Sequence, residues 1–237
     1  MDFRRHIVVF GEAGSGKSEI AINLAIQLAS TGEHVTLVDL DLTKPFLRSR
    51  GALEALSKAH VTLVAPEGEH ASSDLPILLP QVRSLFQDTQ RRIVADVGGS
   101  ESGIRVIHAL KDVIPSDETD FFLVLNSKRP FTDTIEKAVA CAKRMLVSPV
   151  VKLTGVISNT HLKGETDANM VKEGALFAME VAERLGIKRI LVAGKRKICE
   201  ELQREGFEMP LLPLDIYISL SFEAKKGRKV GPPFVLR

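Results

Sequence analysis

Short apolar runs alternate with longer segments of helical spacing along this chain. The runs are rich in valine, isoleucine and leucine and contain few polar residues, a pattern typical of parallel strands that are buried on both faces. Seven runs are clear and an eighth is weaker, and they cover residues 6–10, 34–39, 60–65, 92–97, 120–126, 152–159, 188–193 and 209–213. The pattern therefore predicts a mainly parallel sheet of seven or eight strands.

Three segments between these strands have the spacing of buried or amphipathic helices. Residues 17–30 carry one polar stripe in an otherwise apolar segment, and residues 131–146 and 169–185 place apolar side chains every three to four positions. Gly186 follows the last segment, where a helix C-cap glycine is expected. Helices that alternate with parallel strands cover both faces of a sheet, so we expect a three-layer α/β fold.

Eight consecutive residues between the first strand and the first helix match the phosphate-binding pattern G-x-x-x-x-G-K-[ST]. They are Gly11, Glu12, Ala13, Gly14, Ser15, Gly16, Lys17 and Ser18. Glycine allows the turns that aim successive backbone N–H groups at phosphate oxygens, and the following helix contributes its positive N-terminal end. The motif predicts a P-loop NTPase fold in which Lys17 holds the β and γ phosphates of a nucleotide and Ser18 binds Mg²⁺.

Aspartates stand at the ends of two predicted strands, where a P-loop protein needs carboxylates for its metal ion and its attacking water. Asp39 and Asp41 close the second strand, and Asp96 closes the fourth. An aspartate at a strand end can also cap a turn or a following helix. Since a phosphate loop precedes these residues, we interpret Asp96 as a Walker-B-type aspartate.

With these motifs the chain resembles the MinD/ParA/Mrp group of P-loop ATPases, whose relatives include the nitrogenase iron protein and the cobyrinate (CobQ/CobB) and dethiobiotin synthetases. The resemblance covers most of residues 5–222 and implies a protein that binds ATP and Mg²⁺. It is carried by the phosphate loop, Asp39, Asp41 and the nearby Pro45, Asp96, and the segments 155–159 and 210–215.

The resemblance also implies a role for individual residues. Asp41 corresponds to the switch aspartate that activates the attacking water, so Lys17 and Asp41 are the expected catalytic residues. Asp39 would support the magnesium site. Asp96 would hold the ion through water, together with Ser18.

The base of the nucleotide is expected, on the same resemblance, to contact Asn159 and the loop that contains Pro213 and Asp215. From the residues alone, an asparagine after a strand is as often a turn residue as a base-reading one. ATP is expected over GTP through the resemblance, and the guanine signature N-K-x-D is absent from the sequence. Residues 126–129 come close in position but lack the closing carboxylate.

Two features depart from the family. The relatives carry a second lysine directly after the first glycine of the loop, which reaches a partner subunit's phosphates, whereas this chain has Glu12. A carboxylate about 4 Å from a phosphate oxygen would cost about 1 kcal/mol in water and about 4 kcal/mol at a protein surface, so Glu12 cannot replace that lysine. The candidates to supply the missing cation are Lys44, Arg48 or a partner protein. Residues 97–103 replace the usual segment after Asp96 and predict a flexible, nucleotide-sensing loop.

Composition narrows the remaining classes of protein. The chain has 237 residues, 44% of them hydrophobic, and a net charge of +2 from 32 basic and 30 acidic residues. That balance gives no global field for nucleic acid, and no apolar run approaches the length of a membrane span. Residues 1–224 are expected to form one nucleotide-binding domain. A basic tail, 225–237, follows it, and we expect neither membrane nor nucleic-acid attachment there.

Cysteines and histidines add little to this interpretation. Cys141 and Cys199 are too few for a disulfide framework, and the six histidines show no metal-ligand spacing. The N-terminal apolar run is too short for a signal peptide. We therefore expect a cytoplasmic protein.

Three functions are compatible with these features. The first is a Mg-dependent, slowly hydrolysing ATP switch that controls association with a second copy, as a homodimer, or with a protein client. The second is ATP-dependent phosphoryl transfer or ligation on a small metabolite, as in the synthetase-like relatives, with residues 161–169 lining the substrate pocket. The third is a nucleotide-gated adaptor that does not hydrolyse ATP, which Glu12 favours.

Overall fold

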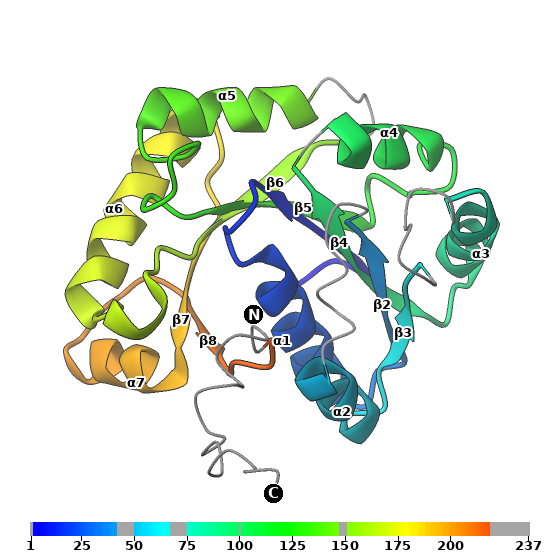
Figure 1. The fold of residues 1–237 in the computed structure, drawn as a ribbon, viewed down its shortest axis with the longest axis horizontal. Helices are drawn as coiled ribbons and strands as arrows, with labels where there is room; N and C mark the ends of the chain where they lie inside the picture. Colours follow the sequence, from blue (N-terminus) through cyan, green and yellow to red (C-terminus); the bar gives the residue numbers. More distant parts are fainter. Residues whose placement is uncertain (1, 42–49, 67–74, 100, 147–150, 219–237) are drawn as a thin grey trace, which may run out of the picture.

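A sheet of eight strands forms the centre of the computed structural model, which describes residues 2–41, 50–66, 75–99, 101–146 and 151–218 (Figure 1). The strands run in the order β3-β2-β4-β1-β5-β6-β7-β8, and every neighbouring pair is parallel. Their bounds are β1 His6–Gly11, β2 Val35–Leu40, β3 Thr62–Val64, β4 Arg92–Gly98, β5 Thr119–Leu125, β6 Leu153–Ser158, β7 Ile190–Lys195 and β8 Leu211–Leu214. The parallel sheet predicted from the sequence is confirmed, including the weak eighth strand.

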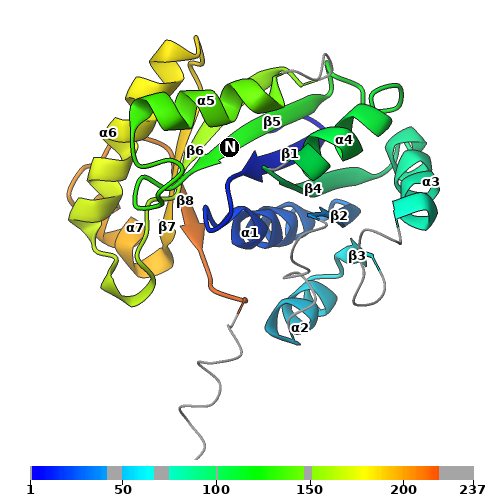
Figure 2. The same ribbon diagram turned by 45° about the horizontal axis from the view of Figure 1, so that its top comes forward.

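Helices cover both faces of this sheet (Figure 2). One face carries α3, α4, α5 and the C-terminal part of α6, whereas α1 and α2 pack on the other face; α7 packs against the N-terminal part of α6. The helices are α1 Lys17–Ala29, α2 Arg50–Lys58, α3 Leu75–Gln87, α4 Glu101–Ala109, α5 Ile135–Met145, α6 Ala168–Arg184 and α7 Arg196–Arg204. The three-layer α/β fold is therefore confirmed.

The unbroken apolar sequence of the central strand β1 follows from these two layers. Successive side chains of a strand point to opposite faces of its sheet. Val8 and Phe10 belong to the core under α3, α4 and α5, whereas Ile7 and Val9 belong to the core under α1 and α2. All four side chains are almost completely buried, with exposed fractions of 0 or 1%.

Two of the predicted helix boundaries can be checked against the capping residues. The helix predicted from residue 131 begins only at Ile135, because Thr134 is its N-cap and accepts a hydrogen bond from Lys137 N at 3.3 Å. That predicted start is wrong. The prediction for Gly186 is confirmed, since this residue follows the end of α6 with a φ of 69°.

The segment after β4 differs from the flexible loop that the sequence predicts for residues 97–103. Val97 and Gly98 belong to β4, and α4 begins at Glu101. A side chain at Gly103 would collide with the carbonyl oxygen of Gly98, so the absence of a Cβ there lets the helix turn back closely onto its strand. The prediction of a loop is therefore wrong for residues 97, 98 and 101–103, whereas Ser100 lies outside the described residues.

Two other expectations concern the ends of the chain and the membrane. The predicted basic tail, 225–237, lies outside the described residues. Within the described ranges, no helix combines the length and the apolar character that a bilayer span requires.

Candidate functional site

The segment Gly11–Ser18, here called the P-loop, connects β1 to α1 at the C-terminal edge of the sheet. Gly14 and Gly16 have φ values of 81° and 85°, which side chains other than glycine rarely adopt. Gly16 is the N-cap residue of α1, and a side chain there would collide with Nδ2 of Asn159. The glycines therefore allow a tight loop whose backbone leads into the positive end of a helix, an arrangement suited to binding anions.

Lys17 and Asp41 form a buried ion pair at this edge. The distance from Lys17 Nζ to Asp41 Oδ2 is 2.6 Å, and the two side chains are 8% and 6% exposed. Burial by itself would lower the pKa of Lys17, but the carboxylates of Asp96, Asp41 and Asp39 and the hydrogen bond to Asp41 raise it above its usual value. Lys17 is therefore charged, and its ammonium group contacts a carboxylate.

Asp39 and Asp96 lie side by side because they are directly paired in the register of β2 and β4. Asp39 accepts a hydrogen bond from the backbone N–H of Asp41 at 3.1 Å, and the Ser18 hydroxyl donates to Asp96 Oδ2. Asp39 Oδ2 and Asp96 Oδ1 are buried without a hydrogen-bond partner among the described residues. Burial, with Asp96 nearby, raises the pKa of Asp39 to about 8, and burial raises that of Asp96 to about 6 although the Lys17 charge opposes it.

These oxygens fit a hard divalent cation. Mg²⁺ prefers oxygen ligands and is usually held by one or two carboxylates together with water and phosphate. Two buried carboxylate oxygens without partners, next to a serine hydroxyl, provide such ligands. No group of three or more histidine, cysteine, aspartate and glutamate side chains in the described ranges is arranged to hold a metal. A metal here would therefore need ligands from a phosphate or from water.

Glu12 is directed away from this site. Its carboxylate pairs with the Arg144 guanidinium on α5, and it also interacts with the thiol of Cys141, whose pKa burial raises to about 12. The Glu12 side chain does not line the pocket beside the P-loop. The expected repulsion between Glu12 and a bound phosphate is therefore offset by Arg144. Lys44 and Arg48, the cations considered from the sequence, lie outside the described residues.

A second set of polar residues, from the ends of β5 and β6, holds the outer side of the P-loop. Asn159 Nδ2 donates to the carbonyl oxygen of Ser15 at 2.8 Å. Asn126 Nδ2 and Arg129 Nε donate to that of Gly14 at 3.4 and 3.1 Å. Asn159 thus contacts the P-loop, and its expected contact with the base remains a prediction. The contacts of Asn126 and Arg129 were not anticipated.

His161 extends this set of contacts. Its Nδ1 lies 2.7 Å from the carbonyl oxygen of Asn159, and burial lowers its pKa despite that hydrogen bond. The imidazole is therefore neutral at physiological pH and lines the pocket beside Gly16.

The chain after β8 is fastened to α1. Asn23 and Asp215 exchange two hydrogen bonds of 2.9 Å through the Asn23 amide and the Asp215 backbone. Glu19 accepts from the backbone N–H groups of Tyr217 and Ile218 at 2.6 and 3.1 Å. Burial raises the pKa of Glu19, although these two hydrogen bonds oppose the shift. This segment, 215–218, is called the β8 extension below.

Apolar residues of β8 and of the β8 extension, rather than Asp215, reach the pocket. Asp215 forms an ion pair with Arg196, through bonds of 3.0 and 2.5 Å. Neither Asp215 nor Pro213 lines the pocket, and Leu214, Ile216 and Ile218 do so instead. The base contacts expected for Pro213 and Asp215 therefore remain predictions, and the neighbouring apolar residues were not anticipated.

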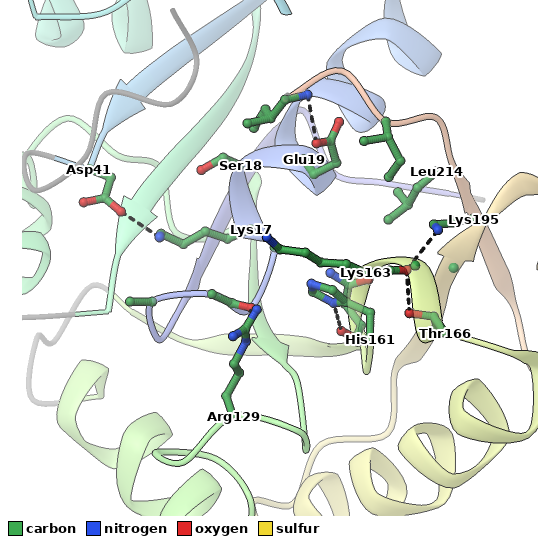
Figure 3. A pocket seen from close by; sticks show the side chains of 18 residues that line it. Lys17, Ser18, Glu19, Asp41, Arg129, His161, Lys163, Thr166, Lys195 and Leu214 are labelled. Carbon is green, nitrogen blue, oxygen red and sulfur yellow. Dashed lines mark hydrogen bonds and ion pairs between the residues drawn. The ribbon is translucent and has the colours of Figure 1, made fainter. Parts of the chain in front are cut away.

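These elements enclose a pocket of about 640 Å³ (Figure 3). The P-loop, Asp41 and Arg129 form one end, and the segment after β6, Lys195 of β7 and the β8 extension form the other. Lys195 Nζ donates to the carbonyl oxygen of Lys163 at 2.9 Å, which fixes the segment after β6 against β7. The pocket lies beyond the C-terminal ends of the strands, where open parallel sheets bind their ligands.

Most of the chain, including the P-loop, matches a known protein family. Residues 7–176 match the CobQ/CobB/MinD/ParA nucleotide-binding domain family, so the chain belongs to that family of P-loop proteins. It is a nucleotide-binding P-loop protein. No curated protein shows significant sequence similarity to it.

Solved structures of related fold were also found. Chloroplast FtsY from Physcomitrella patens superposes with a TM-score of 0.52 at 16% identity, covering 80% of this chain and 59% of that one. The signal recognition particle receptor FtsY from Elizabethkingia anophelis gives 0.52 at 18% identity, with 80% and 58% covered. The signal recognition particle 54 kDa protein from Aeropyrum pernix K1, in complex with GDP, gives 0.52 at 16% identity, with 80% and 41% covered. At such low identities the likeness extends to the fold alone. The chain spans less than two thirds of each of these proteins.

Proposed function

We propose that this protein is a Mg-dependent ATP switch that hydrolyses ATP slowly and controls association with a second copy or with a protein client. The observation that carries the proposal is the buried contact of 2.6 Å between Lys17 and Asp41. Lys17 is the P-loop lysine that would bind the β and γ phosphates. Asp41 and the phosphates of the nucleotide would therefore compete for the same ammonium group of Lys17.

Competition for Lys17 links nucleotide binding to the position of Asp41. Phosphate oxygens entering the P-loop would draw the ammonium group away from the carboxylate. Asp41 would then accept a hydrogen bond from a water molecule and orient it toward the γ phosphate. Asp41 directly follows β2, so nucleotide binding would change the contacts at the end of this strand. A conformational change of that kind is what a nucleotide switch requires.

The metal ion would be held by Ser18 together with Asp39 and Asp96. Mg²⁺ bound there would neutralise part of the charge on the β and γ phosphates. The two buried carboxylate oxygens without partners support this assignment. They are costly to bury unless a cation or a proton compensates them.

The acidic residues of the pocket favour ATP over GTP. Guanine presents N–H donors that a protein usually satisfies with a carboxylate, as in the N-K-x-D signature. Asp41 and Glu19 are the acidic residues that line the pocket in the described part of the chain. Asp41 is paired with Lys17, and the Glu19 oxygens accept from the β8 extension. The adenine ring has a single amino donor and so needs fewer acceptors in the pocket than guanine does. Asn159 would contact the adenine ring.

Experiments can distinguish two alternative functions from the ATP switch. In phosphoryl transfer to a metabolite, the acceptor would lie over the γ phosphate, and release of ADP would depend on the metabolite. Of the segment considered for that pocket, His161, Lys163, Gly164 and Thr166 line the pocket beside the P-loop. A nucleotide-gated adaptor would bind ATP without turnover. Glu12 no longer favours it, because Arg144 neutralises the glutamate outside the pocket.

The test is titration of ATP and of GTP, with and without Mg²⁺, into the wild type, Lys17→Ala and Asp41→Ala, with phosphate release followed on the same samples. A matched control is Lys172→Ala, because Lys172 lies on α6 and pairs with Glu205 at 2.6 Å on the surface. We expect Mg-dependent binding of ATP that is lost in Lys17→Ala, and slow hydrolysis that is lost in Asp41→Ala. If the wild type binds neither nucleotide, the proposal is wrong. If ATP binds but Asp41→Ala hydrolyses it at the wild-type rate, the role of Asp41 is wrong.

A further inference from the structure

Arg129 lies directly against the P-loop. It follows β5, and its Nε donates to the carbonyl oxygen of Gly14 at 3.1 Å. A Cβ at position 14 would come within 2.9 Å of the same nitrogen. The absence of a side chain at Gly14 therefore makes room for the guanidinium group. In Figure 3 the Arg129 side chain points at the loop from the side of the β5–α5 connection.

Three other cations near the P-loop are already paired with carboxylates. Lys17 pairs with Asp41, and Arg144 pairs with Glu12 outside the pocket. Lys128, the neighbour of Arg129, lies 3.2 Å from Glu173 on α6. Arg129 lines the pocket, yet no carboxylate among the described residues pairs with it. Its charge is therefore available to a ligand of the pocket.

From this geometry we propose that Arg129 binds the phosphate groups of the nucleotide within the same chain. The inference rests on the proposed binding of ATP. Nε is committed to Gly14, which leaves the two terminal nitrogens of the guanidinium to donate to phosphate oxygens. A planar guanidinium held at one nitrogen loses little further freedom when it binds a phosphate. The residue at position 12 supplies no cation in this chain, and Arg129 supplies one from the other side of the loop.

Lys163 is the competing candidate for this role. It also lines the pocket, and Figure 3 shows its side chain extended across it. Lys163 is exposed, however, and starts from the segment after β6, at the other end of the pocket from Arg129. The hydrogen bond to Gly14 holds Arg129 in place before the nucleotide arrives, so Arg129 is the better positioned of the two.

A cation supplied in cis has a consequence for turnover. Positive charge on the transferring phosphoryl group is a large term in catalysis of its hydrolysis. If Arg129 supplies that charge, the rate of ATP hydrolysis per chain should not depend on protein concentration. A cation from a second copy would instead make the rate rise with concentration.

The test compares Arg129→Gln with Lys128→Gln, which removes the same charge from the adjacent position outside the pocket. ATP affinity is measured by titration calorimetry at low and at high ionic strength. We expect Arg129→Gln to bind ATP roughly tenfold more weakly at low ionic strength, because a charge-assisted hydrogen bond is lost. The difference from the wild type should shrink at high ionic strength, where salt screens the remaining charges. Lys128→Gln should bind like the wild type.

Salt dependence separates a phosphate contact from a purely structural role. If Arg129 only holds Gly14 in place, Arg129→Gln loses the same factor at both ionic strengths, and the inference is wrong. It is also wrong if both variants bind like the wild type, an outcome that leaves the proposed function intact. If the wild type itself does not bind ATP, both proposals fail.

A second variant covers the case in which Arg129→Gln does not fold, as judged by its thermal unfolding. Arg129→Lys keeps the charge but lacks the Nε donor to Gly14. A phosphate-binding role predicts that this variant keeps the salt dependence of the wild type at reduced affinity. Loss of that salt dependence would overturn the inference.

Discussion

Asp41 Oδ2 lies 2.6 Å from Lys17 Nζ, so the two residues expected to carry the chemistry of ATP hydrolysis contact each other directly. Both side chains are more than nine-tenths buried, which makes the contact stronger than a surface ion pair. Separating the two buried charges costs free energy, whereas a phosphate that replaces Asp41 compensates Lys17 again. The affinity for nucleotide therefore includes the cost of separating this pair.

Replacing Asp41 by asparagine should raise the affinity for ATP. The substitution removes the charged competitor for Lys17, while Asp96 and Asp39 keep the lysine protonated. We expect ATP to bind about 3- to 10-fold more tightly, corresponding to about 0.7–1.4 kcal/mol, and hydrolysis to be lost. Titration calorimetry and phosphate release measure the two effects. Asp133→Asn is the control, because Asp133 forms an exposed pair with Lys137. Weaker binding of ATP by Asp41→Asn would contradict the competition.

Replacing Asp39 by asparagine should stabilise the protein without ligand and weaken its Mg-dependent binding. The carboxylates of Asp39 and Asp96 are buried next to each other, and each has an oxygen without a partner. Asparagine cannot ionise, so it removes the cost of burying the Asp39 carboxyl beside Asp96, which the raised pKa of Asp39 reflects. The free energy of unfolding should therefore rise by about 1 kcal/mol, or Tm by roughly 2–4 °C. Calorimetric unfolding with and without Mg-ATP measures both effects. The exposed Asp117→Asn should change neither, and a lower Tm of ligand-free Asp39→Asn would refute the expectation.

Replacing Gly16 by alanine should abolish nucleotide binding. The residue has a φ of 85°, and a Cβ would collide with the Asn159 amide that holds the loop. We expect ATP affinity to fall at least 100-fold and the free energy of unfolding to fall by about 1–3 kcal/mol. Gly164→Ala is the matched control. It lines the same pocket, but a Cβ there has nothing within 4 Å. Equal ATP affinities of the two variants would show that the loop tolerates the side chain.

His6 should make the stability of the protein depend on pH. Its side chain is fully buried in β1, and burial, together with the charges of Arg5 and Arg92, lowers its pKa from 6.5 to about 4. The unfolded chain therefore takes up a proton near pH 6.5, whereas the folded chain takes it up only near pH 4. The contribution of His6 is constant above pH 6.5, and stability falls as the pH decreases through this window. The loss is at most about 3 kcal/mol.

The measurement is urea unfolding of the wild type and of His6→Gln across this pH range. The difference between their free energies of unfolding should change between pH 6.5 and pH 4 and be flat above it. Replacement of His108, which is exposed on α4, should leave the pH dependence unchanged. A pH-independent difference for His6→Gln would mean that this histidine does not titrate as proposed.

The strands were predictable because burial on two faces leaves a simple trace in the sequence. All eight strands lie within about two residues of the predicted runs, since valine, isoleucine and leucine fill both faces of a parallel sheet. The helices on the outside were harder to predict. Four of them, α2, α3, α4 and α7, were given no predicted range, and α3 even contains Pro80. A single core-facing stripe on a short helix gives a weaker pattern than a doubly buried strand.

The site could be predicted as far as its residues share a motif or a strand end. The structure brings together Lys17, Ser18, Asp39, Asp41 and Asp96, all of which the sequence singled out. Arg129 and His161 carry no motif, because they reach the P-loop from loops after β5 and β6. The polar stripe of α1 did contain a signal. Its members Glu19 and Asn23 bind the β8 extension, which lies almost 200 residues away in the sequence. Asn23 and Asp215, for example, are separated by 192 residues.

The position of β1 in the sheet has a consequence for synthesis of the chain on the ribosome. β1 is made first, but its neighbours in the sheet are β4 and β5, so one edge cannot be completed before Gly98 has been translated and the other not before Leu125. Long-range parallel pairing of this kind forms slowly and leaves apolar segments exposed meanwhile. The apolar side chains of β1, among them Val8 and Phe10, therefore cannot be fully buried until about half of the polypeptide has been synthesised. The nascent chain would need shielding during that interval, for example by a chaperone that holds apolar segments.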